Sequence, residues 1–152
     1  MKVIYHCHGG AHSSVVAAHL HLGNIPMQGE VPPEAIMLLP EFDRATSEDW
    51  GSPKLVGVDG QGNQVYILGL GRKTAICIRA ATSLCLQLRK GGEVVFVETL
   101  SSIGALTRIG GFTSKVLGAE HLGRTLAARG IVKSLERLRQ LVASTKKIYG
   151  ME

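Results

Sequence analysis

The residues best suited to chemistry stand in one short segment near the N-terminus, where glycine, histidine and hydroxyl side chains follow one another. The segment runs from His8 to Ser14 and has the sequence HGGAHSS. Glycine lets the chain turn with successive backbone N–H groups on one side, and the start of a following helix adds a partial positive charge. These features predict a binding site for an anion, built from Gly9, Gly10, Ala11, His12, Ser13 and Ser14.

His12 is the candidate catalytic residue of this segment. An imidazole with an unperturbed pKa of about 6.5 gains and loses a proton near neutral pH, as a general acid or base must. Ser13 and Glu98 are candidate ligands for Mg²⁺, because Glu98 ends the apolar run VVFVE, where the carboxyl end of a parallel strand meets a ligand. The alternatives are that Glu98 only marks a strand end and that Gly9-Gly10 only permits a tight turn.

The segment resembles a degraded phosphate-binding loop of nucleotide hydrolases. That motif, G-x-x-x-x-G-K-[ST], supplies a lysine for the phosphates and a hydroxyl for magnesium. Here His12 stands in place of the lysine, Ser13 and Ser14 supply hydroxyls, Ala11 replaces the last glycine, and the first glycine is missing. ATP binding therefore does not follow from the motif, whereas an anion-binding loop does.

Two later glycine-containing turns carry cations. The sequence GLGRKT places Arg72 and Lys73 at a predicted strand-to-helix turn, and Arg108 comes just before the pair Gly110-Gly111. A guanidinium binds phosphate or carboxylate through two parallel hydrogen bonds, and an ammonium binds it as a point charge. We expect these three cations to neutralise a bound anion. The alternative is that they are ordinary solvated side chains beside turns.

A histidine cluster and a cysteine offer two rival hypotheses. Five of the six histidines lie between His6 and His21 with Cys7 among them, which raises a zinc or iron site. However, no CxxC or HExxH spacing occurs, and strand alternation turns Cys7 away from its neighbouring histidines. Cys7 also opens a strand–loop–helix like that of cysteine phosphatases, but the motif C-x5-R needs an arginine where Ser13 stands. We therefore rank both hypotheses below an anion site.

Regular elements on both sides must position this loop. Val3–Cys7 has the β-branched and aromatic residues of a strand, and Val15–Leu22 reads as a helix that ends at Gly23. The later pattern predicts a helix Glu34–Leu39 and a hairpin of Lys54–Val58 and Gln64–Leu68. It then predicts a buried helix at about Thr74–Arg89 and a strand Glu93–Glu98 whose two faces are both covered by other elements. The last predicted elements lie at Leu100–Arg108 and Phe112–Leu117, followed by a final helix at about Ile131–Lys147. This alternation predicts one α/β domain over residues 1–152: three layers, a mostly parallel sheet with one β-hairpin, similar to the P-loop nucleotide-binding fold.

Composition and charge exclude several classes of protein. With 45% hydrophobic and 19% charged residues the chain is not intrinsically disordered. No apolar run reaches the roughly 18 residues of a membrane helix, no signal peptide is present, and three cysteines make no disulfide framework. We expect a reduced, soluble, cytoplasmic protein with no membrane partner.

The charge is unevenly divided along the chain. Residues 1–60 hold three cations and seven anions, whereas residues 61–152 hold 14 cations and five anions. A basic half invites a nucleic-acid partner, but aromatic residues are only 5% and do not interleave with the cations as stacking platforms would. The expected partner is therefore a small anionic molecule, a phosphate or a nucleotide.

A resemblance to a known family covers most of the chain. The opening segment VIYHCHGGAHSSVVAAHLHLG, the stretch Leu39–Asp43, the pair Gly62-Asn63 and the stretch Val95–Thr99 resemble DUF3189, a family of uncharacterised bacterial proteins. The resemblance implies no reaction, but it supports the choice of the glycine, histidine and serine positions of the loop. We favour a phosphate- or nucleotide-binding module without turnover over a phosphoryl-transfer or hydrolase enzyme that uses His12 as its acid or base.

Overall fold

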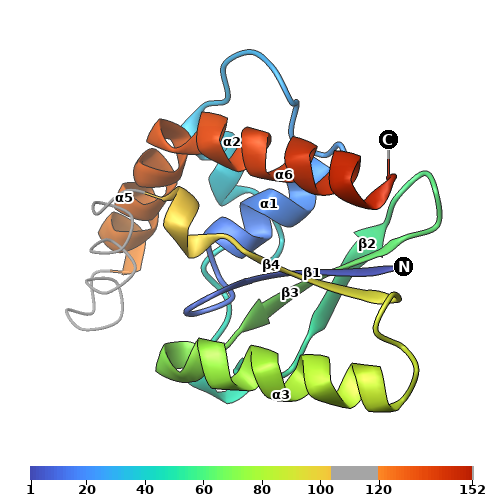
Figure 1. The fold of residues 1–152 in the computed structure, drawn as a ribbon. Helices are drawn as coiled ribbons and strands as arrows, with labels where there is room; N and C mark the ends of the chain where they lie inside the picture. Colours follow the sequence, from blue (N-terminus) through green and yellow to red (C-terminus); the bar gives the residue numbers. More distant parts are fainter. Residues whose placement is uncertain (104–119, 152) are drawn as a thin grey trace.

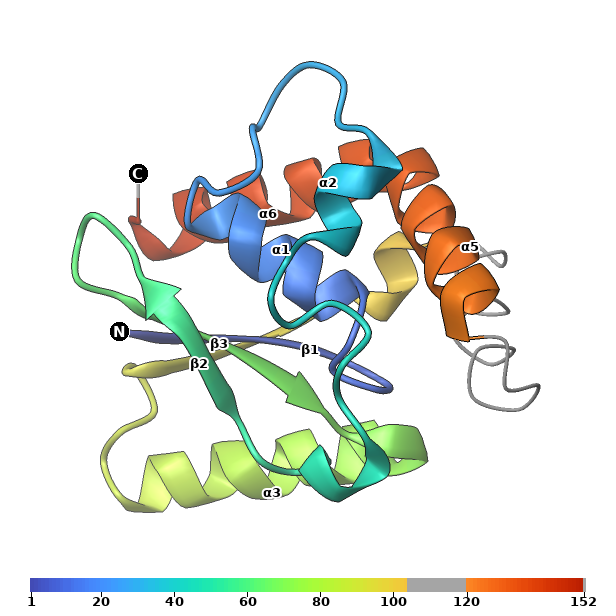
Figure 2. The same ribbon diagram turned by 180° about the vertical axis from the view of Figure 1, so that it is seen from behind.

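A four-stranded mixed sheet with helices on both faces forms the centre of the α/β protein (Figures 1 and 2). The computed structural model describes residues 1–103 and 120–151. The strands are β1 (Lys2–Cys7), β2 (Lys54–Val58), β3 (Gln64–Gly69) and β4 (Val94–Glu98). Their order is β2-β3-β1-β4. β1 is parallel to both β3 and β4, and β2 is antiparallel to β3, which confirms the predicted hairpin.

The two faces of the sheet carry different helices (Figures 1 and 2). One face is covered by α1, against which α6 packs, and the other face is covered by α3. The α-helices are α1 (Ser13–His21), α2 (Pro33–Met37), α3 (Thr74–Gln87), α5 (Glu120–Lys133) and α6 (Leu135–Tyr149). Short 3-10 helices lie at η1 (Ser47–Asp49), η2 (Gly71–Lys73) and η3 (Leu100–Ser102). No helix in the part of the chain that the structure describes is long and apolar enough to cross a membrane.

The hydrophobic core lies between the sheet and α6, with α1 inside it. All nine residues of α1 are buried, which explains why its sequence is apolar on every side. Val3 and Tyr5 of β1 point to this core, together with alternate residues of the neighbouring strands. The last helix turns an apolar stripe toward this core, because Leu135, Leu138, Val142 and Thr145 are all buried.

The C-terminal helices differ from the prediction in one respect. Instead of one helix from Ile131, the chain forms α5 and α6 with a break at Ser134, and Ile131 belongs to α5. Two glycines, Gly123 and Gly130, lie within α5 and hide its helical pattern, because glycine is a poor helix former. The part of Leu100–Arg108 beyond residue 103, and the predicted element Phe112–Leu117, lie outside the described residues.

The prediction that α3 is buried was wrong. None of its residues is buried, and the residues least exposed form a single half-buried stripe, Thr74, Cys77, Ile78, Ala81 and Cys85. Within residues 1–103 and 120–151, α3 is the one long helix on its face of the sheet, so its outer side faces solvent. β4 likewise is an edge strand, and only Val95 and Val97 are buried.

A buried polar network joins the far end of β1 to the hairpin. The Tyr5 hydroxyl donates to Nδ1 of His21 at 2.9 Å, and Nε2 of His21 donates to Asp59 at 3.1 Å. Asp59 also accepts hydrogen bonds from the backbone of Gln61 and from the backbone and side chain of Asn63. Burial raises the pKa of Asp59, but these hydrogen bonds outweigh it and lower the pKa from 3.8 to about 2. Burial lowers the pKa of His21 below 6.5, although its hydrogen bond with Asp59 raises it.

Asp59→Asn is expected to lower the free energy of unfolding by about 2 kcal/mol, because one carboxylate oxygen becomes an amide NH₂ that faces other donors. Urea unfolding at pH 7 measures this loss. Glu136→Gln, at an exposed carboxylate paired with Arg139 at 3.6 Å, is the control and should change stability by less than about 0.5 kcal/mol. Equal losses in the two variants would show that the network is not a special source of stability.

The same network sets how stability depends on pH. His21 stabilises the fold in its neutral form, so this contribution is complete above pH 6.5 and is lost as the pH falls through its lower folded pKa. Asp59 stabilises the fold in its charged form, so its contribution is complete above pH 3.8 and is lost as the pH falls toward 2. Urea midpoints should therefore fall on acidification in two stages, and Asp59→Asn should lack the second stage.

Candidate functional site

The loop between β1 and α1 lies at the carboxyl end of the central parallel strand. The chain passes from β1 to β3 over the face that carries α1, and from β3 to β4 over the opposite face through α3 (Figures 1 and 2). When the connections on two sides of a strand leave to opposite faces, a crevice opens at the carboxyl ends, and ligands of α/β proteins bind there. Residues 8–12 occupy this position.

Two glycines let this loop lie directly against the end of β3. Gly10 has φ +68°, and a Cβ atom there would lie 2.7 Å from the backbone nitrogen of Gly69. A Cβ atom on Gly69 would lie 2.8 Å from the carbonyl group of Gly9. The N–H of Gly71 donates to the carbonyl oxygen of His8 at 2.9 Å and holds the two segments together. Backbone packed against backbone therefore determines the shape of the loop.

The backbone N–H groups of the loop are largely unused. The N–H of Gly10 donates to Sγ of Cys7 at 3.1 Å. Among the described residues, no acceptor lies within hydrogen-bonding reach of the N–H groups of Gly9, Ala11, His12, Ser13 and Ser14. His8 is exposed, Gly9 and His12 are half-buried, and Gly10, Ala11, Ser13 and Ser14 are buried. The first turn of α1 adds its partial positive charge to these donors.

The two serines hold the helix start in place rather than face solvent. Ser13 and Ser14 are fully buried. The hydroxyl of Ser13 donates to Oγ1 of Thr99 at 2.9 Å, because Thr99 donates its own hydrogen to the carbonyl oxygen of His6. Ser14 is hydrogen-bonded to Sγ of Cys7 at 3.3 Å. Thr99 therefore connects the loop to β4, a role that the sequence analysis missed because 86 residues separate it from Ser13.

His12 forms a pair with a carboxylate that the sequence analysis did not assign to the site. Nε2 of His12 lies 2.9 Å from Oδ1 of Asp43, and the ring stands edge-on to Phe42. The N–H of Asp43 donates to the carbonyl oxygen of Ala11 at 3.0 Å, so this residue contacts the loop at two points. A carboxylate only accepts, so Nε2 carries the hydrogen. Nδ1 is then the free nitrogen, with no partner among the described residues.

The structure does not bring Ser13 and Glu98 together. The carboxylate of Glu98 accepts the N–H groups of Leu100 and Ser101, and it lies beside His6 on the face of the sheet that carries α3. Ser13 lies on the opposite face, bonded to Thr99. Within residues 1–103 and 120–151, no group of three or more histidine, cysteine, aspartate or glutamate side chains is placed to hold a metal ion.

The predicted histidine cluster is divided among separate partners. His19 pairs with Glu41 at 2.9 Å and His21 with Asp59 at 3.1 Å, each through its Nε2. His6 lies on the other face, and its buried Nδ1 has no hydrogen-bond partner among residues 1–103 and 120–151. Burial lowers the pKa of His6, although the charge of Glu98 raises it.

The predicted cations lie beside the segment that contacts the loop, or outside the described residues. Arg72 and Lys73 form η2 directly after Gly71, whose N–H is bonded to the loop, and both side chains are exposed. Neither has a hydrogen bond or ion pair with another described residue. Arg108 lies outside the described residues. The two described cations are therefore free to approach a ligand at the carboxyl end of the sheet.

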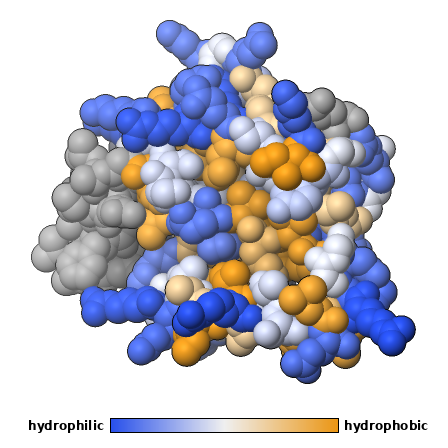
Figure 3. Space-filling view, in the orientation of Figure 1, coloured by the Kyte–Doolittle hydropathy of each residue, from blue (hydrophilic) through white to orange (hydrophobic). Residues whose placement is uncertain are grey.

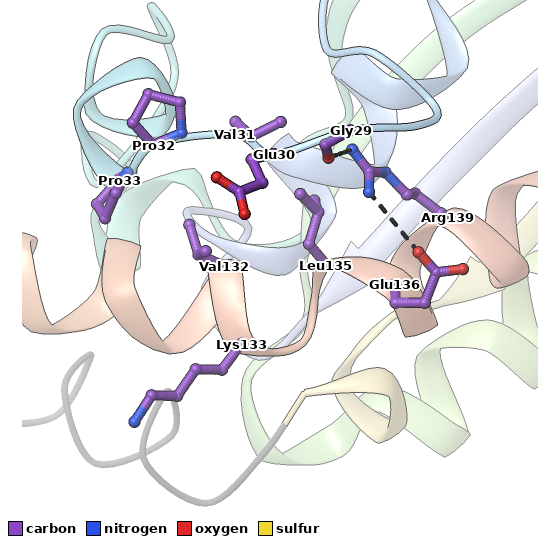
Figure 4. A pocket seen from close by; sticks show the side chains of 10 residues that line it. All are labelled: Gly29, Glu30, Val31, Pro32, Pro33, Val132, Lys133, Leu135, Glu136 and Arg139. Atoms are coloured by element: carbon purple, nitrogen blue, oxygen red, sulfur yellow. Dashed lines mark hydrogen bonds and ion pairs between the residues drawn. The ribbon is translucent and has the colours of Figure 1, made fainter.

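A second hollow, of about 500 Å³, lies between the loop before α2 and the junction of α5 and α6 (Figure 4). Arg139 is its main polar group, but the guanidinium donates to the carbonyl oxygens of Pro26 and Gly29 and pairs with Glu136. Lys133 points away from the hollow (Figure 4). The guanidinium of Arg139 thus already has its hydrogen-bond partners, and the loop after β1 remains the better candidate for a ligand site.

Gly10→Ala is expected to destabilise the protein by more than about 2 kcal/mol, since the new methyl group meets backbone and the residue must keep a positive φ. Gly23→Ala is the matched control, because Gly23 has φ +78° but no atom within 4 Å of its Cβ position, and its cost should be about 1 kcal/mol. Urea unfolding of both variants gives the comparison. Equal costs would contradict the close contact between the loop and β3.

Comparison with known proteins gives one family. A family model described as "Protein of unknown function (DUF3189)" matches residues 2–147, nearly the whole chain. No curated protein matches the chain, and no solved structure matches it.

Proposed function

The chain belongs to the DUF3189 family, and we propose that it binds a phosphate or nucleotide ligand in the loop between β1 and α1. One observation carries the proposal. The N–H groups of Gly9, Ala11, His12, Ser13 and Ser14 have no acceptor among the described residues, although the loop packs closely against β3. Backbone N–H groups rarely stay unpaired in a buried segment, so an oxyanion that accepts several of them satisfies this need.

The position of the loop supports a phosphate over a neutral ligand. The loop lies where the connections of the sheet leave to opposite faces, a place where ligands of α/β proteins bind. It also lies at the start of a helix, whose partial positive charge favours an anion. The order of strand, loop and helix is that of P-loop proteins, and we propose that this loop likewise binds a phosphate group. His12 takes the place of the P-loop lysine, and its protonated form adds a positive charge next to the bound anion.

The surrounding cations supply the remaining charge in this proposal. Arg72 and Lys73 follow the segment of β3 that the loop touches, and both are exposed and unpaired among the described residues. Arg108 is a third candidate by sequence alone. An arginine fork can bind two phosphate oxygens at once, so these cations suit the outer phosphates of a nucleotide.

A second candidate function is phosphoryl transfer or hydrolysis, and the pair of His12 and Asp43 favours it. The carboxylate holds the ring in one tautomer, which leaves Nδ1 free to take a proton from water or to give one to a leaving group. Ser13 and Glu98 are engaged elsewhere, so no step of this proposal is assigned to a metal held by these two residues. Binding without turnover remains our first proposal, because binding by the loop N–H groups needs no further group.

Thermal unfolding with orthophosphate, ADP and ATP tests the binding proposal. A ligand at 100 times its Kd stabilises the folded protein by about 2.7 kcal/mol, which for a chain of this length raises Tm by about 5–10 °C. His12→Gln should weaken binding about tenfold, because it removes the imidazole that this proposal places against the anion and the pair with Asp43 that orients it. Release of inorganic phosphate from ATP, lost in His12→Gln, would favour the enzyme over the binding module.

His19→Gln is the matched control for this experiment. His19 lies on the same helix and pairs with Glu41 at the same 2.9 Å distance, but it is far from the loop amides along α1. Its binding constants should equal those of the wild type. If none of the three ligands raises Tm, or if both variants lose binding equally, the loop is not a phosphate site.

A further inference from the structure

The outer surface of α3 is unusually apolar for a helix at the edge of a protein. We call the α3 surface the exposed aliphatic side chains of this helix and its end: Ile76, Leu84, Leu86 and Leu88, which are 58–65% exposed. A helix that covers a sheet normally turns one apolar stripe inward and polar residues outward. Here the inward stripe is present and further large aliphatic residues remain in contact with water. Clustered exposure of this kind marks an interaction surface.

These side chains form a ridge rather than a groove. At 100° per residue, Ile76 points away from the half-buried stripe, Leu84 lies on one flank of the helix and Leu86 on the other. Leu88 follows the last turn in line with the stripe and is exposed because it lies at the end of the helix. A partner must therefore accept a convex, apolar helix. A deformable bilayer interface does so without a preformed groove, because the helix lies in the interface with its apolar side among the acyl chains.

The charge around the ridge is predominantly positive, although Lys90 forms an ion pair with Glu93 at the end of the helix. Arg72, Lys73, Arg79, Arg89 and Lys90 are all exposed and lie at both ends and in the middle of α3. No aspartate or glutamate occurs between Asp59 and Glu93. Figure 3 shows blue and orange side chains beside one another along the lower edge of the molecule, where α3 lies in Figure 1. The complementary surface is therefore anionic as well as apolar.

We propose that the α3 surface docks on an anionic lipid bilayer, with α3 parallel to the membrane plane, its leucines at the level of the acyl chains and its cations among the headgroups. A second copy of this chain fits poorly, because two α3 surfaces would bring like charges together. The expectation of no membrane partner came from the length of apolar runs, which concerns helices that cross a bilayer and not helices that lie on it. The inference does not require the proposed ligand of the loop, although Arg72 and Lys73 are candidates for both surfaces.

Co-sedimentation of the full chain with vesicles tests the proposal. The protein should pellet with phosphatidylcholine vesicles that contain about 30% phosphatidylglycerol, stay in solution with phosphatidylcholine alone, and be released by salt. Arg79→Gln with Arg89→Gln should lower the partition about 25-fold, at about fivefold for each cation. Ile76→Ser with Leu84→Ser should lower it at least as much, since it removes two apolar side chains from the outer side and flank of α3.

Matched variants on the other face of the molecule are the controls. Leu38→Ser and Ile148→Ser change aliphatic side chains that are 83% and 73% exposed, and Arg137→Gln with Lys147→Gln removes two exposed cations of α6. All controls should bind like the wild type, and circular dichroism verifies that each variant is folded. The proposal is wrong if the wild type stays in solution with the anionic vesicles. An acidic protein segment would then be the alternative partner of this surface. It is equally wrong if control and α3 variants lose binding to the same extent.

Discussion

The contact between the loop after β1 and the end of β3 is the constraint on which the candidate site depends. Gly10 and Gly69 approach so closely that neither position has room for a side chain, and the N–H of Gly71 closes the contact with His8. The loop therefore cannot relax toward its own carbonyl groups, and its N–H groups stay without acceptors among the described residues. In our proposal, these donors at the start of a buried helix form an anion site that exists before the ligand binds.

Local features of the sequence were sufficient to predict the strand–loop–helix, the hairpin and a helix over most of α6. The glycine loop was found because strand, turn and cap residues follow one another within a few positions. Asp43 and Thr99 were missed because they are 31 and 86 residues from the side chains they contact, and no local pattern reports such pairs. The burial of α3 was misjudged for a related reason: an apolar helix does not reveal whether a second layer lies outside it.

Histidine has two different roles along α1 and its neighbours. His21 is buried between Tyr5 and Asp59 and fixes the hairpin to the helix, a structural use that depends on its neutral form. His12 has the same kind of carboxylate partner, but it lies at the entrance of the loop with one nitrogen free. The difference is one of position: a paired histidine far from the loop stabilises the fold, and a paired histidine beside unpaired N–H groups can act on a ligand.

The central claim is that the N–H groups between β1 and α1 converge on an anion. Titration of ¹⁵N-labelled protein with orthophosphate, followed by two-dimensional NMR, observes these groups one at a time. The account predicts saturable shifts that are largest for the amide signals of Gly9, Ala11, His12 and Ser13, with those of α6 unchanged. Shifts that appear elsewhere while these four signals stay in place would contradict it.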